Sequence, residues 1–320
     1  MSSINTNNSA MNALATLRNV NQGLNQTQDR ISTGLKVSDA GDNAAYFAIS
    51  ETMKGDSGMT KSINESLTLT KNSLATAKVG AESFQDLARQ FSERVAFAQA
   101  GGSVDDVKDE LDEIVKQMDA SISQATFNGD DLIGSGNEAK TGVTATIGDD
   151  GSITTAAETD NGARSMSVVT GIKRGADGIT ATSMTVEGVD LKRAYLDFAA
   201  IAEDFKSGFD TAADTGADAA AKEESGQTYL NNSLAASEKL LGEAIDAATT
   251  LGVGQKSIEN QQEFLTKLSN NLDAGVGAMV DANMEEEAAR LQALQVQQQL
   301  ASQSLSIANQ APQNILSLFR

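Results

Sequence analysis

The nearest approach to a ligand-binding motif in this sequence is a glycine-rich segment that continues into a lysine and a serine. It runs Gly252-Val253-Gly254-Gln255-Lys256-Ser257. A phosphate-binding loop needs glycine directly before the lysine, so that backbone amides and the ammonium group surround the phosphate, and Gln255 occupies that place. No apolar strand precedes the segment. We therefore interpret it as an interruption of a helix.

Acidic clusters offer oxygen ligands for a hard cation. They are Asp149-Asp150, Glu285-Glu286-Glu287, and the set Asp210, Asp214 and Asp218 along one helical face. None has the spacing of an EF-hand loop, and such charge runs are usually solvated faces or first turns of helices. We expect no metal site, no cofactor and no catalytic residue.

The composition excludes several classes of protein. The 320 residues contain no His, Cys or Trp, which rules out a Ser–His–Asp triad, a thiolate nucleophile, disulfides and imidazole metal ligands. The formal net charge of −20, with a pI near 4.3, opposes binding to a nucleic-acid backbone. No run is apolar and long enough to span a bilayer, and the first residues lack the pattern of a cleaved signal peptide. We expect no enzyme, no nucleic-acid partner and no membrane insertion.

The most regular helical pattern lies in the first half of the chain. Apolar residues from Ile63 to Val95 recur in steps of three and four, which predicts a helix roughly 50 Å long. Gly101-Gly102 should end this helix, and Ser103 should cap a returning helix from Val104 to Ala125.

Both ends of the chain carry related apolar stripes. These run from Met11 to Leu35, from Ile258 to Met279 and from Met284 to Ala308, and the single proline, Pro312, interrupts none of them. We expect helices from opposite ends to pack together. The predicted fold class is mainly α, with long terminal helices in a coiled coil or bundle that is discontinuous in sequence.

Residues 130–225 differ in character and predict a small, exposed, β-containing insert. They hold 8 basic and 18 acidic residues, a net −10. Val143, Ala145 and Ile147 alternate with polar residues before the turn signal Asp149-Asp150-Gly151, which predicts a hairpin, and Met184 and Val186 repeat the alternation weakly. A short helix is expected from Tyr195 to Phe205.

The terminal segments are unusually poor in charge. Only Arg18 is charged among the first 28 residues, and no residue is charged from Leu291 to Phe319. A frayed, low-complexity tail is one interpretation. We favour burial against copies of the same helices, because amides and hydroxyls can hydrogen-bond across such an interface whereas repeated like charges repel.

Several motifs, in order and at both ends, resemble bacterial flagellin. They are Asp29–Leu35 (DRISTGL), Ser38–Ala45 (SDAGDNAA), Phe127–Gly129 (FNG), Leu251–Glu259 (LGVGQKSIE) and Ala308–Leu318 (ANQAPQNILSL). The resemblance implies a structural subunit that self-assembles into the flagellar filament for swimming motility. It also implies an extracellular location, reached without a cleaved signal peptide.

The resemblance further implies three domains along the chain. Residues 1–45 and 281–320 would form the terminal coiled-coil polymerisation domain, 46–129 and 226–280 the helical core domain, and 130–225 the variable, solvent-exposed insert. Apolar positions of the terminal segments would form the polymerisation interface, within one subunit and between neighbours. They are Ile4, Met11, Leu14, Leu17, Val20, Leu24, Ile31, Leu35, Met284, Leu291, Leu294, Leu305, Ile315 and Leu318.

The partners implied by the resemblance are all flagellar. They are other copies of the chain, sister flagellins, the flagellar cap and hook–filament junction proteins, an export chaperone that holds the C-terminal helix, and the type III export apparatus.

Immune receptors read two segments of flagellins, and this sequence departs from the family in both. Plant receptors read the segment that matches Asp29 to Ser50, where Gly41 and Asn43 replace a lysine and an aspartate. An animal Toll-like receptor reads a helical patch where Ser92, Arg94 and Phe97 stand in place of an arginine, a leucine and a glutamine. We predict weak recognition by both.

Two other functions compete with the filament subunit. A hook–filament junction protein shares the helical ends, but the Ser317–Arg320 ending and the paired motifs favour the filament subunit. An acidic surface adhesin acting through residues 130–225 is the less favoured alternative.

Overall fold

The computed structural model describes residues 7–134, 145–147, 153–155, 165–175, 178–214 and 219–318. It divides into two compact units, one made of Met1–Met59 with Lys267–Arg320 and the other of Thr60–Thr266. Two long helices, α2 (Ala40–Gln99) and α5 (Ala219–Val280), contribute residues to both units. Within the described residues, no helix combines the length and the apolarity that crossing a bilayer requires.

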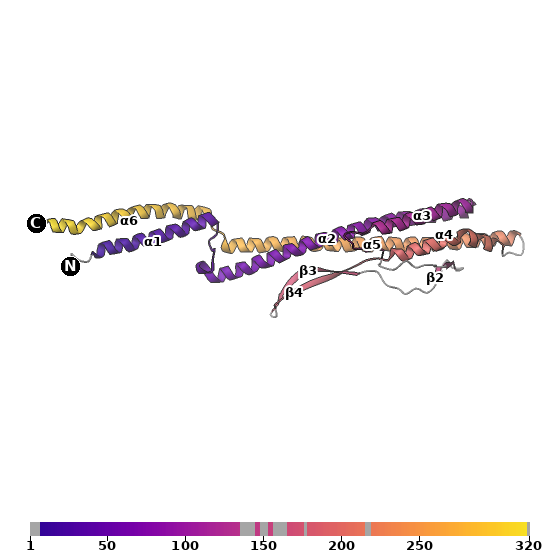
Figure 1. The fold of residues 1–320 in the computed structure, drawn as a ribbon, viewed down its shortest axis with the longest axis horizontal. Coiled ribbons are helices and arrows are strands. Elements are labelled where there is room, and N and C mark those ends of the chain that lie inside the picture. Colours follow the sequence, from indigo (N-terminus) through magenta and orange to yellow (C-terminus); the bar gives the residue numbers. More distant parts are fainter. Residues whose placement is uncertain are drawn as a thin grey trace. The chain divides into compact units, whose positions relative to one another are not determined.

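In the first unit, α1 (Asn8–Thr33) and α6 (Met284–Leu318) lie side by side although they come from opposite ends of the chain (Figure 1). The Asn7 side chain caps α1 by accepting the Ala10 N–H. Gly34 ends the helix at φ +74°, a conformation that glycine adopts without strain. The predicted pairing of the two chain ends is confirmed.

The chain leaves α1 through a short segment that is fixed to the end of α5. The Lys36 N–H donates to the Val280 carbonyl at 2.6 Å, and Val37, Val276 and Val280 form a small buried cluster. Near the start of α2, Asn43 has non-helical backbone angles, and its side chain accepts the N–H groups of Ala45 and Tyr46.

The second unit packs α2 and α5 with α3 (Val104–Gln124) and α4 (Leu191–Asp214). The glycine pair ends α2 as predicted, with Gly101 at φ +99°, and the Ser103 side chain caps α3 by accepting the Asp106 N–H. The family motif Phe127–Gly129 forms a tight turn in which Asn128 and Gly129 have positive φ, so this turn favours those two residue types.

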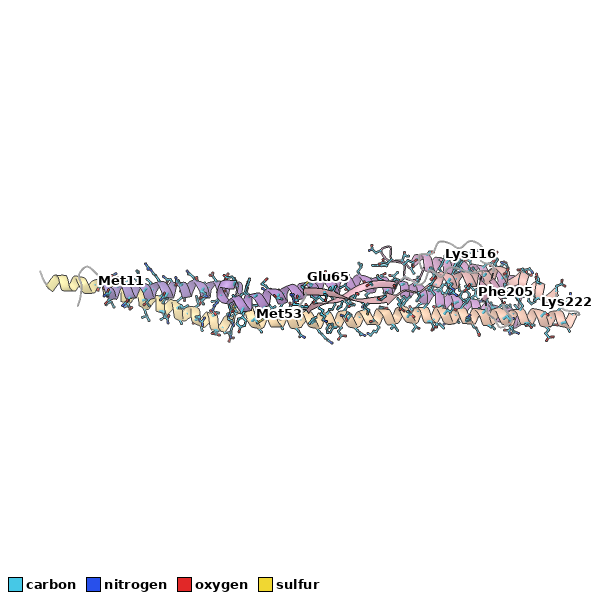
Figure 2. The ribbon with its side chains drawn as sticks, turned by 90° about the horizontal axis from the view of Figure 1, so that it is seen from below. Met11, Met53, Glu65, Lys116, Phe205 and Lys222 are labelled. Atoms are coloured by element: carbon cyan, nitrogen blue, oxygen red, sulfur yellow. The ribbon has the colours of Figure 1, made fainter. Side chains whose placement is uncertain are left out.

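Large apolar side chains from all four helices fill one core. The most deeply buried include Leu67, Leu74, Phe84, Phe91, Leu111, Met118, Phe198, Ile201, Phe205, Leu230 and Leu251. The acidic middle segment therefore contributes to this core, contrary to the expectation of a separate insert. The short helix expected at Tyr195–Phe205 is the 24-residue helix α4, and its Phe198 and Phe205 are fully buried. Figure 2 labels Phe205.

The middle segment also holds two antiparallel strand pairs. Strands β1 (Ala145–Ile147) and β2 (Ile153–Thr155) pair where a hairpin was predicted. Val143, the turn residues Asp149–Gly151 and Asp218 lie outside the described residues. Strands β3 (Ser165–Gly175) and β4 (Gly178–Glu187) form a longer hairpin, of which only the β4 alternation was recognised. Val168 and Val186 bury this hairpin against the helical core.

Candidate assembly surface of the terminal helices

The glycine-rich segment singled out for phosphate chemistry lies inside α5. The helix continues through Gly252–Ser257, so the predicted interruption is wrong. Its glycine content has a packing reason, because a Cβ added at Gly254 would lie 3.0 Å from Leu74 and 3.4 Å from Val186. The acidic triplet Glu285–Glu287 occupies the first turn of α6, as predicted for a helix N-terminus.

The predicted interface positions separate into two groups. The first group lines the seam between α1 and α6, where Val20 is buried and the other members are half-buried. These others are Leu17, Leu24, Ile31, Leu291, Leu294 and Leu305. Leu35 is also half-buried, but it lies beyond the end of α1 and packs against Val37, Val276 and Val280. Helices α1 and α6 approach each other closely at Gly23, where an added Cβ would lie 3.5 Å from the Leu294 side chain. This group holds the two terminal helices of one chain together.

The second group remains exposed. Met11 is 63% exposed, Met284 47% and Leu14 38%, and Figure 2 shows Met11 near the start of α1. Ile4 lies outside the described residues, and Ile315 and Leu318 lie in α6 with side chains that the structure does not describe.

Three exposed apolar residues of α6 were missed by the sequence analysis. Val296, Leu300 and Ile307 are 55%, 58% and 64% exposed. They follow one another in steps of four and seven, which is itself a helical stripe, but the stripe through Leu291 and Leu294 was followed instead. Helix α6 therefore carries apolar residues both on the face that contacts α1 and on its exposed surface. Helix α1 alone leaves part of this apolar surface uncovered.

Two polar contacts across the seam join uncharged groups. Gln298 donates to the Asn21 side chain at 2.7 Å, and Asn7 donates to the Ala308 carbonyl at 2.8 Å. A groove of about 310 Å³ opens between the same two helices. Its walls carry no charged residue and consist of Ala13, Thr16, Val20, Gln297, Leu300, Ala301 and Ser304.

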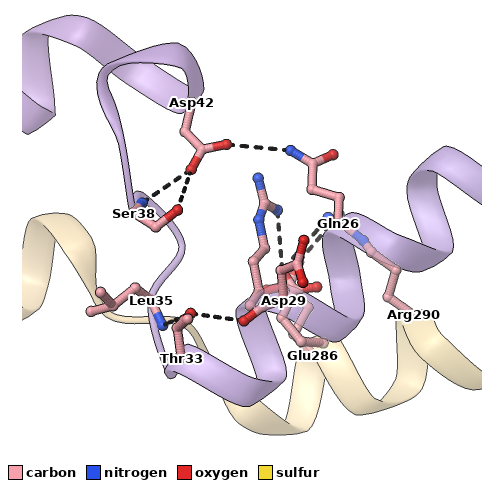
Figure 3. Close-up of polar contacts among 10 residues, drawn as sticks. Gln26, Asp29, Thr33, Leu35, Ser38, Asp42, Glu286 and Arg290 are labelled. Carbon is pink, nitrogen blue, oxygen red and sulfur yellow. Dashed lines mark hydrogen bonds and ion pairs between the residues drawn. The ribbon is translucent and has the colours of Figure 1, made fainter.

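The segment after α1 is organised around one carboxylate. Figure 3 shows Asp42 between Ser38 and Gln26. The backbone N–H of Ser38 donates to Asp42 at 3.0 Å and its hydroxyl at 3.1 Å, and these bonds hold the pKa of Asp42 below its usual value. This carboxylate therefore has a structural role in shaping the connection between α1 and α2.

The predicted receptor positions differ in accessibility. Gly41, Arg94 and Phe97 are exposed, with Arg94 Nε 3.1 Å from Glu110 Oε2 and Phe97 56% exposed. Asn43 is half-buried. Ser92 is buried, and its hydroxyl donates to the Ala88 carbonyl at 3.2 Å. Arg94 and Phe97 are therefore the surface positions of this patch.

Terminal helices that pair along a largely uncharged seam, and that expose further apolar side chains, define a helical subunit of a self-assembling filament. Comparison with known proteins agrees. Residues 4–139 match the bacterial flagellin N-terminal helical region, and residues 234–319 match the bacterial flagellin C-terminal helical region.

Curated relatives match over the full length of the chain. A flagellin of Brucella melitensis biotype 1 is 33% identical over 324 residues, and flagellin C of Rhizobium meliloti (strain 1021) is 34% identical over 332, with all of each chain covered. Flagellin FljM of Caulobacter vibrioides is 31% identical over 324 residues, covering 100% of this chain and 99% of the relative. The chain belongs to the bacterial flagellin family, a family of structural proteins, and it is a subunit of the flagellar filament, an extracellular appendage. Nothing in these comparisons favours a junction protein or an adhesin.

Proposed function

We propose that the chain polymerises through the outer faces of α1 and α6, while the seam between these helices holds each subunit's own ends together. The observation that carries the proposal is the exposure of large apolar side chains on helices with almost no charge, above all Val296, Leu300 and Ile307. Exposed apolar patches of this kind typically mark protein–protein contacts. Met11, Leu14 and Met284 extend the contact to α1 and to the start of α6.

The predicted division into three domains fits this arrangement, except that α4 belongs to the helical core and not to the insert. The terminal segments 1–45 and 281–320 are the polymerisation domain. Helices α2, α3, α4 and α5 supply the helical core, and the rest of residues 130–225 is the variable insert. A net −10 over residues 130–225 favours separation of neighbouring filaments by electrostatic repulsion.

Family membership supports the remaining partners of the proposal. The chain leaves the cell through the flagellar type III apparatus without a cleaved signal peptide, and an export chaperone holds its C-terminal helix. The absence of cysteine suits passage through a narrow conduit, since no disulfide has to be opened. Assembly then involves the cap protein, the hook–filament junction proteins and, where present, sister flagellins.

The test is seeded polymerisation of purified full-length chain, followed by pelleting and electron microscopy. Removal of residues 291–320 should abolish tube formation. The sharper variant combines Val296→Gln with Ile307→Gln, two exposed residues of α6 that do not line the groove between α1 and α6. Each leucine-sized burial is worth about 1.5–3 kcal/mol, so the critical concentration should rise about tenfold or more for each lost contact.

Gln299→Ala is the matched control, because Gln299 is exposed on the same helix and its replacement removes no apolar side chain. Circular dichroism should show equal helix content for all three chains. Normal polymerisation of the double variant would contradict the proposed surface, and failure of the unaltered chain to polymerise under any seeding would contradict self-assembly.

A further inference from the structure

A charged side chain is buried in the otherwise uncharged seam between α1 and α6. The side chain of Glu287 is 7% exposed and that of its partner Arg30 21%, with Arg30 Nη1 3.3 Å from Glu287 Oε1. Arg290, one turn further along α6, places Nη1 3.7 Å from the same oxygen. Figure 3 shows this part of the seam, with Arg290 and Glu286 on α6. Among the described residues, Arg30–Glu287 is the ion pair that joins the two helices.

The ion pair is largely buried, and its hydrogen bonding is incomplete. Arg30 Nε and Glu287 Oε2 are both buried without a hydrogen-bond partner in the protein. A buried ion pair with incomplete hydrogen bonding adds little net stability, because desolvation offsets the attraction between the charges. Its strongest physical effect is to disfavour other alignments of the two helices. Any alignment that separates the partners leaves Glu287 with Arg290 alone and leaves the largely buried Arg30 without a carboxylate.

The rest of the seam does little to distinguish one alignment from another. Along α6 the residues are a mixture of Leu, Ala, Gln and Ser, and the polar contact Gln298–Asn21 joins two amides of types that recur along both helices. Sliding α6 by one turn, about 5.4 Å, would bring similar side chains together again. The slide would break the Arg30–Glu287 contact and move Leu294 away from Gly23, and the ion pair is the charged contact that it removes.

The position of the pair strengthens this role. Arg30 lies one turn before Gly34, where α1 ends, and Glu287 lies in the first turn of α6. The backbone bond from Ala282 N–H to the Gly34 carbonyl, 2.8 Å long, is close by in the chain. The charge contact and the backbone contact therefore lie at the same end of the helix pair, and the uncharged remainder extends away from them.

We infer that the Arg30–Glu287 pair determines the register of α1 against α6, and that it thereby sets how the exposed apolar residues of the two helices align for assembly. The second part rests on the proposed function. Arg30 and Glu287 are positioning residues, because they act through the helices that carry the contact surface.

The absence of native cysteine permits a direct test in the full-length chain. Asn21→Cys with Gln298→Cys reports the observed register, because these two side chains meet at 2.7 Å. Asn21→Cys with Ser302→Cys reports a slide of one turn. Each pair is oxidised in an otherwise unaltered chain and in the Glu287→Gln chain, and the yields of the two intramolecular disulfides are compared.

Glu287→Gln should raise the ratio of the shifted to the observed disulfide about tenfold. Glu286→Gln is the matched control, since Glu286 lies in the same helical turn with a side chain 67% exposed, and it should leave the ratio unchanged. An unchanged ratio with Glu287→Gln would overturn the inference.

The charge-exchanged chain, Arg30→Glu with Glu287→Arg, separates register from simple loss of folding. It should restore the observed disulfide even if Glu287→Gln lowers both yields, and failure to restore it overturns the inference. The disulfide ratio is measured on monomers, so it stands apart from polymerisation. A correct ratio in a chain that never forms filaments would contradict the proposed function and leave the register assignment in place.

Discussion

The phenyl rings of Phe91 and Phe198 meet edge to face, with 4.9 Å between their centroids and an interplanar angle of 64°. Phe198 also contacts Phe84, at 6.0 Å. Phe91 and Phe84 belong to α2, whereas Phe198 belongs to α4 in the acidic middle segment. Helix α4 is therefore a structural part of the core and cannot be exchanged as freely as a surface insert.

Replacing Phe198 with alanine tests this assignment. Removal of a buried phenylalanine costs about 3–5 kcal/mol, through lost burial and the cavity that remains. Phe264→Ala is the control, because Phe264 is 57% exposed and its loss should change the free energy of unfolding by about 0.5 kcal/mol or less. Urea denaturation followed by circular dichroism measures both, and equal effects would contradict the core role of α4.

A second pair of variants tests helix packing at glycine. A Cβ at Gly80 would lie 2.3 Å from the Ala125 Cβ and 2.7 Å from the Ile133 Cδ1, so Gly80→Ala should destabilise the chain by about 1–3 kcal/mol. Nothing lies within 4 Å of the same position at Gly242, also inside a helix. There alanine should stabilise by roughly 0.5–1 kcal/mol. Thermal melting curves that shift in the same direction would refute the contrast.

Oxidation with hydrogen peroxide can locate the assembly surface. Met11 is 63% exposed and should convert rapidly to the sulfoxide in the monomer, whereas fully buried Met118 should resist. Within filaments Met11 should become protected, because the proposed contact covers it. Peptide mass spectrometry of monomers and filaments provides the comparison, and equal oxidation of Met11 in both would place it outside the contact.

The free energy of unfolding should depend on pH through the phenol of Tyr229. Burial raises the pKa of Tyr229 to about 12, and its hydroxyl donates to the Asp204 carbonyl at 2.9 Å. Since the folded pKa lies above the ordinary value of about 10, this stabilising contribution is complete below pH 10 and is lost as the pH rises towards 12.

Tyr229→Phe should therefore cost about 1 kcal/mol at neutral pH, from the lost hydrogen bond. The difference from the unaltered chain should narrow between about pH 10 and pH 12. Denaturation curves across this range measure it, and a constant difference would show that folding does not raise the pKa of the phenol.

The structure shows which of the predicted receptor positions are exposed. Exposed Arg94 and Phe97 are accessible to a Toll-like receptor, whereas Ser92 is buried. Weak activation is expected, and Arg94→Leu with Phe97→Gln should raise it. For the plant receptor, Gly41→Lys with Asn43→Asp should raise activation in the same way. Reporter-cell assays test both, and ordinary activity of the unaltered chain would contradict the prediction.

The regular helices of this chain could be predicted from sequence because one physical signal determined them. Apolar steps of three and four, the Gly101-Gly102 stop and the Ser103 cap predicted α3 almost residue by residue and the C-terminal part of α2, although α2 begins earlier, at Ala40. The glycines at 252 and 254 predict a helix interruption by their local conformational freedom, but α5 continues through them, and at Gly254 close packing against Leu74 favours glycine.

Other features depend on contacts that sequence patterns do not contain. The composition of residues 130–225 indicated a separate insert, and only the three-dimensional contact between Phe198 and Phe91 shows where α4 packs. The seam and exposed groups of α1 and α6 look alike in sequence, because both are apolar residues at helical spacing. Their separation requires knowledge of which face the partner helix covers.

Pairing α1 with α6 has a consequence for the timing of folding during protein synthesis. Arg30 and Glu287 are 257 positions apart, so the ribosome makes most of the chain before α1 meets its partner. The second unit can fold earlier, because its four helices are already complete. A nascent chain therefore carries an unpaired first helix throughout most of its translation, and the terminal unit forms last.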